Sequence, residues 1–350
     1  MLTGNKGEWS ELYVFLKLLG DGVLYAADEK LNKKEDLYYP LVEVLRTEHG
    51  EIRHYVKEDV FIKIVDINGR VLLRLSANEF ATKAEKLLSV IKKSDVGTFP
   101  VPDIEAFMHT IGCSKIKADS KDKSDITLVL HDEKIQKNGA FNFSIKSRLG
   151  KSSTLFNAGK CTNFIYEIDG SVPKKTEKLN VKGRVKFIYG QGAHLRFIKT
   201  ESETFEANLC LVDSLFSRIL SEYILEYYLG NGKTVRELTE RINEKNPCGF
   251  NTRLQHPYEY KMKHFLTAIA LGMMPSSVWD GYEQTTGGYI IVKEDGDVLC
   301  YHLYNRNEFR EYLFQNTRFD TPSPSRHDFG YIYRENGKSF MKLNFQIRFM

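Results

Sequence analysis

An aspartate and a lysine on two consecutive predicted strands are the side chains of this chain best placed to do chemistry. Asp125 opens one run of alternating apolar residues, and Lys146 ends a second run beside Ser144. Side chains alternate faces along a strand, so Ser144 and Lys146 are expected to share one face. The opposite, buried face would then hold Phe141, Phe143 and Ile145. Asn138-Gly139 between the runs predicts a two-residue hairpin turn, which would bring the carboxylate and the ammonium group to one edge of a small sheet.

A carboxylate beside an ammonium group is the smallest set of side chains with which a protein could carry out metal-dependent hydrolysis of a phosphodiester bond. The metal polarises the scissile phosphate and lowers the pKa of the attacking water. Magnesium prefers oxygen ligands, keeps several waters, and needs one or two carboxylates besides the phosphate. Asp125 would be the first ligand, and Lys146 would orient the water or help to deprotonate it.

Ser144 stands two residues before the lysine, where the usual second metal ligand is Asp or Glu. A hydroxyl cannot replace that charge, so a second carboxylate must come from another element. Glu8 and Glu11 are candidates, because their i, i+3 spacing on a predicted helix puts them on one face. Glu11 also lies four residues before Phe15, beside the apolar stripe. A carboxylate that faces a core needs a partner, and a metal site would provide one.

Each of these residues also has an ordinary structural explanation. The helix dipole alone favours acidic residues in a first helical turn. Asp125 would suit a turn at the start of a strand, and Lys146 would suit a surface lysine whose stem packs on apolar neighbours. An aspartate followed by a serine–x–lysine pattern occurs by chance, so this pattern alone favours the structural explanation.

The composition is that of an ordinary soluble globular protein, with 42% hydrophobic and 27% charged residues. A net charge of +4 permits a nucleic-acid partner without requiring one. No window of eighteen apolar residues predicts a membrane span. The cysteines are odd in number, scattered and without a C-x-x-C motif, so we expect reduced thiols in a cytoplasmic protein without a zinc site. They are Cys113, Cys161, Cys210, Cys248 and Cys300.

The pattern along the chain predicts alternating helical and β segments. Helices are expected over residues 7–19, 79–92, 103–110, 212–229, 235–244 and 258–271, the first of them with Asn5 or Thr3 as a cap. Strands are expected over 181–189 and 195–199, and hairpins over 60–75, 289–304 and 331–349 that turn at Asn68-Gly69, Asp295-Gly296 and Asn336-Gly337. We predict a catalytic half, 1–200, and a half of helices and hairpins, 201–350, without a Pro/Gly/Ser-rich linker between them.

Several blocks of sequence together carry more information than the aspartate and lysine alone. They are Asn5-Lys6-Gly7-Glu8-Trp9-Ser10-Glu11-Leu12-Tyr13, Lys123-Ser124-Asp125-Ile126, Ser144-Ile145-Lys146-Ser147 with Leu149-Gly150, Thr154-Leu155-Phe156-Asn157-Ala158, Thr162-Asn163-Phe164, Ser325-Arg326-His327-Asp328-Phe329-Gly330 and Leu343-Asn344-Phe345-Gln346-Ile347-Arg348-Phe349. These blocks resemble the HpaII-type restriction endonucleases, and the resemblance covers most of the chain.

The resemblance implies an α/β fold of the PD-(D/E)XK nuclease superfamily: a central mixed β-sheet flanked by helices, here with an added helical segment and C-terminal β-hairpins. It implies Mg²⁺-dependent cleavage of double-stranded DNA at a short palindrome, for which CCGG is the type specificity. Two residues depart from the pattern, because Ser124 replaces a proline and Ser144 an acidic residue. In this superfamily the missing carboxylate moves to another element. Lys6-Gly7-x-x-x-Glu11 resembles a first-helix pattern with a metal-binding glutamate, which favours Glu11 over Glu8; Glu167 is a minor alternative.

The resemblance also implies partners and a location. A palindromic target favours a homodimer, and a cognate DNA methyltransferase would act in the same bacterial, cytoplasmic system without binding to this chain. Residues 201–350 would contribute DNA recognition and dimer contacts. The alternative is a nucleic-acid-binding protein that keeps the fold and has lost the chemistry, as Ser144 would suggest. Base and phosphate contacts are expected from Arg148, Asn157, Arg326, His327 and Gln346.

Overall fold

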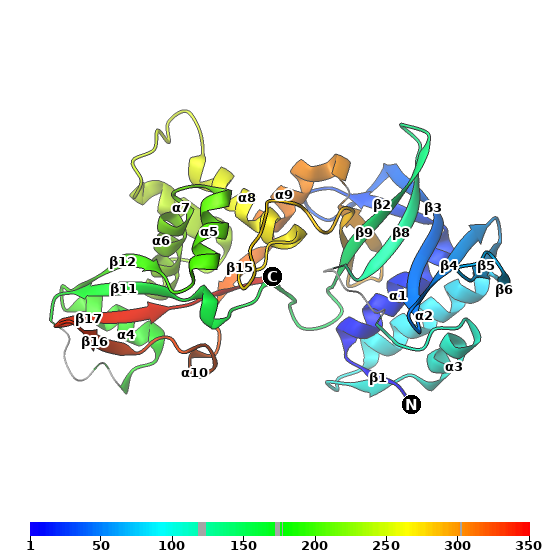
Figure 1. The fold of residues 1–350 in the computed structure, drawn as a ribbon, viewed down its shortest axis with the longest axis horizontal. Helices are drawn as coiled ribbons and strands as arrows, with labels where there is room; N and C mark the ends of the chain where they lie inside the picture. Colours follow the sequence, from blue (N-terminus) through cyan, green and yellow to red (C-terminus); the bar gives the residue numbers. More distant parts are fainter. Residues whose placement is uncertain (118–123, 172–175, 177, 302) are drawn as a thin grey trace. The chain divides into compact units, whose positions relative to one another are not determined.

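The computed structural model describes residues 1–350 except 118–123, 172–175, 177 and 302, so Lys123 of the second block lies outside the described residues. The chain divides into two compact units (Figure 1). Unit 1 consists of residues 1–153 and 284–309, and unit 2 of residues 154–283 and 310–350. These units do not follow the predicted division at residue 200.

The segment 284–309 belongs to unit 1 because it completes the sheet that carries the lysine. Its strand β13 (Gly288–Val292) pairs in parallel with β9 (Lys137–Ser147), and Ile291 lies opposite Lys146. Pairing between strands far apart in the sequence cannot be read from local patterns, which is why the predicted boundary misses it. The predicted hairpin itself is confirmed, since β13 pairs with β14 (Val298–Tyr301) around Gly296.

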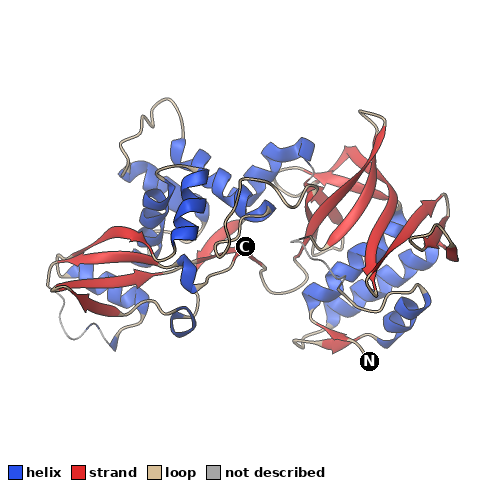
Figure 2. Cartoon of the chain, viewed as in Figure 1, coloured by secondary structure: helices blue, strands red, loops and turns tan. Residues whose placement is uncertain are grey.

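A mixed sheet forms the centre of unit 1 (Figure 2). Its strand order is β2-β14-β13-β9-β8-β3-β4-β5-β6, and β2 also pairs with the beginning of β3. The pairs β13–β9 and β14–β2 are parallel and the others antiparallel. The remaining strands are β2 (Val23–Ala27), β3 (Lys33–Glu48), β4 (Glu51–Glu58), β5 (Phe61–Val65), β6 (Val71–Ser76) and β8 (Ile126–Asp132), with a short pair of β1 (Thr3–Gly4) and β7 (Phe99–Pro100).

Helix α1 (Lys6–Asp21) lies between this sheet and α2 (Ala77–Lys93). Asn5 caps its start: the Asn5 side chain accepts hydrogen bonds from Gly7 N and Glu8 N, and the Glu8 carboxylate accepts one from Asn5 N at 2.8 Å. This capping box confirms the predicted helix and the choice of Asn5 as its cap. At the other end α1 and α2 approach closely, because a Cβ on Gly20 would lie 2.8 Å from the Ala81 backbone. Helix α3 (Pro102–Thr110) confirms the shorter predicted helix.

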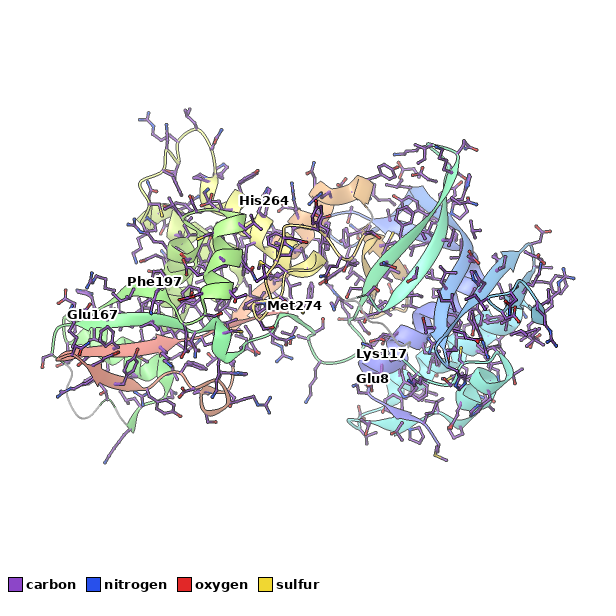
Figure 3. The ribbon with its side chains drawn as sticks, viewed as in Figure 1. Glu8, Lys117, Glu167, Phe197, His264 and Met274 are labelled. Atoms are coloured by element: carbon purple, nitrogen blue, oxygen red, sulfur yellow. The ribbon has the colours of Figure 1, made fainter. Side chains whose placement is uncertain are left out.

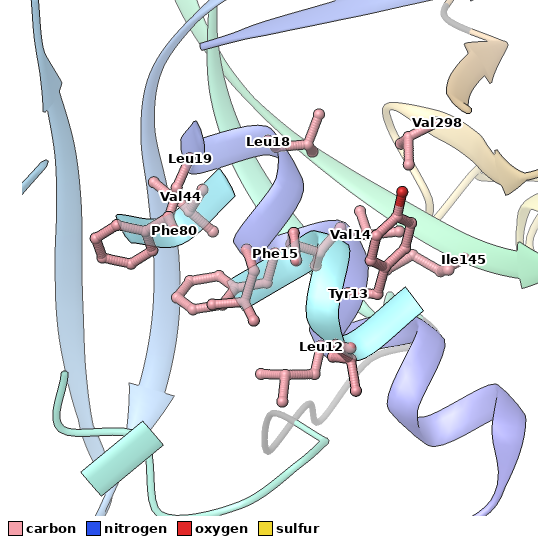
Figure 4. Close-up of a cluster of buried hydrophobic side chains, with 14 of the residues drawn as sticks. Leu12, Tyr13, Val14, Phe15, Leu18, Leu19, Val44, Phe80, Ile145 and Val298 are labelled. Carbon is pink, nitrogen blue, oxygen red and sulfur yellow. The ribbon is translucent and has the colours of Figure 1, made fainter. Parts of the chain in front are cut away.

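The core of unit 1 is built around α1, which is buried on most of its circumference. Figure 4 shows Phe15 and Leu19 of α1 among Val44 of β3 and Phe80 of α2, with Ile145 of β9 in the same cluster. Because large apolar side chains are buried on several faces of α1, the helix is fixed against rotation about its axis and against sliding along the sheet. Any side chain on its remaining face therefore has a defined position.

The hairpin of β8 and β9 is confirmed, but its predicted turn is wrong. The chain turns at residues 133–136, where Gln136 takes a positive φ of 52°. Gly139 instead lies within β9 opposite Leu130. A Cβ on Gly139 would lie 2.8 Å from the Phe141 ring, so this glycine makes room for an aromatic ring rather than for a turn. The buried face is as predicted, with Phe143 and Ile145 buried and Phe141 partly buried.

Unit 2 combines two further sheets with a group of helices. One sheet has the order β12 (His194–Thr200), β11 (Phe164–Asp169), β17 (Lys338–Leu343), β16 (Ile332–Glu335); the other has β10 (Thr154–Phe156), β18 (Gln346–Phe349), β15 (Thr317–Asp320). The helices are α4 (Val181–Gly190), α5 (Glu203–Val212), α6 (Phe216–Leu229), α7 (Val235–Lys245), α8 (Pro257–Leu271), α9 (Arg306–Gln315), which begins in unit 1, and α10 (Pro324–His327). Short 3₁₀ turns lie at Lys160–Thr162 and Leu303–Asn305.

Three predictions for unit 2 are wrong in detail. Residues 181–189 form helix α4 rather than a strand, because burial recurs at helical spacing (Val181, Arg184, Val185 and Ile188) and Asn180 caps the start. The helix predicted over 212–229 begins only at Phe216, as α6, and a separate helix that was not predicted, α5, ends just before it at Val212. The C-terminal hairpin β16–β17 ends at Leu343, after which β18 joins another sheet. Within the described part of the chain, no helix has the length and apolar character needed to cross a membrane.

Candidate active site

Asp125 is held rigidly at the start of β8. Its backbone N–H donates to Phe143 O at 2.8 Å, which continues the pairing with β9. One carboxylate oxygen, Oδ2, accepts hydrogen bonds from Ile145 N at 2.8 Å and from the Ser144 hydroxyl at 3.1 Å. The other oxygen, Oδ1, is therefore left to face the second carboxylate and the lysine described below. Ser144, which replaces an acidic residue, thus acts here as a hydrogen-bond donor to the aspartate.

Glu11 faces the same place from helix α1. Its side chain is only 15% exposed, and its oxygen Oε2 is buried without a hydrogen-bond partner among the described residues. Burial and the nearby charge of Asp125 raise the pKa of Glu11 from its ordinary value of 4.5 to about 7. A buried carboxylate with an unsatisfied oxygen is the kind of group that a bound cation would stabilise.

Lys146 completes the arrangement from β9. Burial lowers the pKa of Lys146, although the charges of Asp125 and Glu11 oppose that effect. Its ammonium nitrogen lies 5.3 Å from the centre of the Tyr289 ring, on the neighbouring strand β13. Tyr289 comes from the distant segment 284–309, so its place in the site cannot be predicted from the residues around Lys146.

A pair of serines ties the two elements of the site together. The Ser10 side chain lies 2.8 Å from that of Ser147, and 2.6 Å from the carbonyl oxygen of Lys6. Ser10 immediately precedes Glu11, and Ser147 immediately follows Lys146. This contact between α1 and β9 fixes the separation of the glutamate and the lysine.

Glu11 and Lys146 line an open depression of about 770 Å³. Its walls come from the beginning of α1, residues 94–97 and the segment 145–153, all of them in unit 1. The depression is large enough to admit a phosphate group and its neighbouring atoms. A backbone that enters it would meet the glutamate and the lysine together.

Lys117 is a member of this site that sequence analysis missed. Its nitrogen lies 3.3 Å from Glu11 Oε1 and 3.3 Å from Asp125 Oδ1. Burial would lower the pKa of Lys117, but the charges of Glu11 and Asp125 outweigh it and raise that pKa. The residue lies in a lysine-rich segment, and nothing in the spacing distinguishes it from its neighbours.

Glu8 and Glu167 do not join the two carboxylates. Glu8 belongs to the capping box of α1, which is the ordinary explanation considered above. Glu167 lies on β11 in unit 2, in ion pairs with Arg196 at 2.6 Å and Lys338 at 2.9 Å. Figure 3 labels Glu8 and Lys117 in unit 1 and Glu167 in unit 2.

The residues expected to contact DNA are divided between the units. Arg148 follows β9 in unit 1, where its backbone N–H donates to Val292 O. Asn157 and Arg326 are exposed in unit 2, and His327 ends helix α10 beside Arg326. The Gln346 amide donates to Asp320 Oδ2 at 3.0 Å, so it is engaged within its own sheet.

A buried asparagine pair in unit 2 joins three of the blocks noted in the sequence. Asn344 donates to Asn163 Oδ1 at 2.6 Å, and both side chains are fully buried. Asn163 in turn donates to the carbonyl oxygen of His327 at 3.0 Å and to Glu201 at 2.7 Å. The turn that carries Arg326 and His327 is thereby fastened to the sheet.

The donor set of Asp125 and Glu11 fits magnesium. Both supply carboxylate oxygens, and the unsatisfied Glu11 Oε2 would gain a partner. No group of three or more His, Cys, Asp or Glu side chains suited to a metal occurs among the residues that the structure describes. Magnesium would therefore have two protein carboxylates, and water and phosphate would complete its shell, as is common for this ion.

Two carboxylates beside a lysine that lines an open depression can serve metal-assisted hydrolysis of a phosphate ester. The family model described as HpaII restriction endonuclease matches residues 5–349. The type II restriction enzyme HpaII of Haemophilus parainfluenzae is 43% identical over 354 residues, which cover 99% of this chain and 99% of that enzyme. No solved structure matches the chain.

The chain belongs to the HpaII restriction endonuclease family. It is accordingly a type II restriction endonuclease, an enzyme that cleaves DNA at specific sites, and the family resemblance stated from its sequence is confirmed. The alternative of a binding protein without chemistry is thereby set aside.

Proposed function

We propose that this enzyme hydrolyses duplex DNA at a short palindrome, with CCGG as the expected sequence, using Mg²⁺ held by Asp125 and Glu11 in a PD-(D/E)XK-type core. The observation that carries the proposal is the convergence of these two carboxylates and Lys146 from three elements of unit 1. A mixed sheet with α1 packed against it supports the nuclease-type core.

Asp125 Oδ1 and the two oxygens of the Glu11 carboxylate are available to a cation, since Asp125 Oδ2 already accepts hydrogen bonds from Ser144 and Ile145. When bound there, magnesium would supply Lewis-acid polarisation of the phosphate and a more acidic water. Ser144 keeps the aspartate oriented, and the contact of Ser10 with Ser147 keeps Glu11 at its distance from Lys146.

Lys146 accepts the proton of the attacking water. Its lowered pKa means that a larger fraction of its amine is neutral near pH 8 than in an exposed lysine. As the water oxygen bonds to phosphorus and the bond to the leaving oxygen breaks, the Lys146 amine accepts the proton of the water. The resulting ammonium group lies beside the negative charge that develops on the phosphate.

DNA recognition is assigned to the polar residues outside this centre. Arg326 and His327 are presented by a turn that Asn163 anchors, and Arg148 and Asn157 are further contacts. Arginine and asparagine suit direct readout of base edges in the major groove. A palindromic target is matched by a two-fold homodimer, and a cognate methyltransferase would protect the same sequence in the host.

The test is cleavage of two linear DNAs of equal length that differ only in one site, CCGG or GGCC. We expect discrete fragments from the CCGG duplex with Mg²⁺ and none with EDTA. An intact CCGG duplex across Mg²⁺ and Mn²⁺ would refute the proposed sequence, and cleavage of both duplexes would refute the specificity.

Lys146→Met tests the assignment of the lysine. It should slow cleavage by at least about 10²-fold and leave binding to the CCGG duplex intact, because the change removes only the amine. Lys137→Met, on the same strand but exposed at its other end, is the matched control and should cleave normally. Normal cleavage by Lys146→Met would show that the site lies elsewhere.

A further inference from the structure

Lys117 occupies an unusual position for a lysine that sequence analysis did not single out. One nitrogen contacts one oxygen from each of the two carboxylates, Glu11 Oε1 and Asp125 Oδ1, at 3.3 Å in both cases. Those carboxylates come from α1 and from the start of β8, and a cation between them offsets their repulsion. The position between the two oxygens is also where a shared divalent ion would lie.

We propose that the ammonium group of Lys117 occupies the space between Glu11 and Asp125 when no metal is bound. A divalent ion that binds to the two carboxylates displaces this group. This inference rests on the proposed function, because it requires that the two carboxylates form the metal site. It assigns Lys117 the role of a positioning residue that competes with metal for the two carboxylates and thereby sets the affinity for metal.

The segment before Lys117 is firmly anchored. Buried Arg46 and Glu48, at the end of β3, form an ion pair of 2.5 Å. Glu48 accepts hydrogen bonds from the Ser114 backbone at 2.8 Å and its hydroxyl at 2.6 Å, and Arg46 donates to the carbonyl oxygen of Ile116 at 3.3 Å. The backbone is thus held up to the residue before Lys117, which places the base of the lysine side chain beside the site.

The lysine itself remains free to exchange. Its side chain is 52% exposed, whereas those of Glu11 and Asp125 are 15% and 13% exposed. A half-exposed ion pair contributes little, because water screens it and the long side chain loses freedom. A divalent ion carries twice the charge and can bind both carboxylates directly, so it can displace the ammonium group into solvent at small cost.

Lys293 provides a matched comparison within unit 1. Its nitrogen also contacts two carboxylates, Asp295 at 3.0 Å and Asp297 at 3.7 Å. Those aspartates are 59% and 51% exposed and lie in a turn. Water satisfies them when the lysine is absent, so Lys293→Met should leave metal binding unchanged.

The experiment measures Mn²⁺ binding without DNA from the loss of the electron paramagnetic resonance signal of free Mn²⁺. Lys117→Met should bind Mn²⁺ roughly threefold to tenfold more tightly than the natural protein, the range expected for removing two weak competing ion pairs. Lys293→Met should match the natural protein, and Asp125→Asn should lose the site.

Unchanged or weaker binding by Lys117→Met, with binding still lost in Asp125→Asn, would overturn the inference and leave the proposed metal site standing. Binding that Asp125→Asn does not affect would overturn both. A second readout needs no variant: acetylation of Lys117, followed by mass spectrometry, should accelerate several-fold on saturation with Mn²⁺, while that of Lys293 stays constant. A Lys117 rate that stays constant or falls would also overturn the inference.

Discussion

Replacing Glu11 by glutamine removes a charge that the fold of unit 1 buries at a cost. The pKa of Glu11 is raised from 4.5 to about 7, so the folded protein binds a proton more tightly than the unfolded chain does. A group of this kind makes its full contribution to stability below pH 4.5, and that contribution is lost as the pH rises towards 7. Glutamine has the shape of the protonated glutamate and avoids the loss.

The magnitude follows from the two pKa values. The difference between 4.5 and about 7, at ~1.4 kcal/mol per pH unit, corresponds to about 3 kcal/mol of folding free energy at pH 8. At pH 5 most of the effect has disappeared, and less than about 1 kcal/mol should remain. Glu11→Gln should therefore be more stable than the natural protein at pH 8 in EDTA, and nearly equal to it at pH 5.

The assay must report on unit 1 alone. The chain has two tryptophans, and Trp9 is fully buried in α1 while Trp279 lies in unit 2. In a Trp279→Phe background, urea denaturation followed by fluorescence reports on the surroundings of Glu11. Glu8→Gln is the control on the same helix, because glutamine can take the same place in the capping box. A Glu11→Gln protein that is less stable at pH 8, or equally stabilised at both values, would refute the reasoning.

Three further predictions concern the site and the turn that carries Arg326 and His327. Lys146→Ala should slow cleavage by about 10²- to 10⁴-fold. The cleavage rate of the natural enzyme should increase with pH and reach its plateau below the ordinary lysine pKa of 10.5, because the pKa of Lys146 is lowered. Single-turnover rates on an oligonucleotide duplex measure both effects. Ser144→Ala should weaken Mn²⁺ binding by about tenfold, since Asp125 loses a hydrogen bond to its charged form. Asn163→Ala should raise the rate of tryptic cleavage after Arg326 on the order of tenfold or more, because the anchor of His327 is lost.

Each of these predictions has a matched control. Lys137→Ala should retain full cleavage, and a pH–rate profile that is flat between pH 6 and 9 would argue against proton transfer by Lys146. Unaltered Mn²⁺ binding in Ser144→Ala would mean that Ile145 N alone orients the aspartate. Asn157→Ala, at an exposed asparagine, should leave the tryptic rate unchanged; equal rates in the two variants would show that the buried asparagines do not hold the turn.

Ser144 and Glu11 together suggest how a nuclease site can lose an acidic residue on one strand and use a carboxylate from another element. In the proposed metal site, Ser144 carries no charge beside Asp125 but donates a hydrogen bond to it, and the second carboxylate would come from Glu11 on α1. Two carboxylates on adjacent positions of one hairpin would repel each other in a buried site. Supplying one from α1 allows Lys117 to lie between them.

The sequence by itself determined what depends on neighbouring residues. The capping box of α1, the alternation that buries Phe143 and Ile145, and the hairpin turning near Gly296 all rest on interactions within a few residues. Spacing alone also placed an aspartate and a lysine on paired strands, but it favoured a structural explanation for them, and the family resemblance was needed to indicate a nuclease site.

Only the tertiary structure decided what depends on contacts between distant segments. The segment 284–309 joined the sheet of unit 1 because β13 pairs with β9, far away in the sequence, which also brings Tyr289 near Lys146. Lys117 joined the site because Arg46 and Glu48, far away in the sequence, hold the segment before it. Burial and charge act through space, so the pKa of Glu11 and the partner of its carboxylate follow from the packing of α1 against α2, β9 and β3 and from the nearby charges of Asp125 and Lys117, not from the residues beside it.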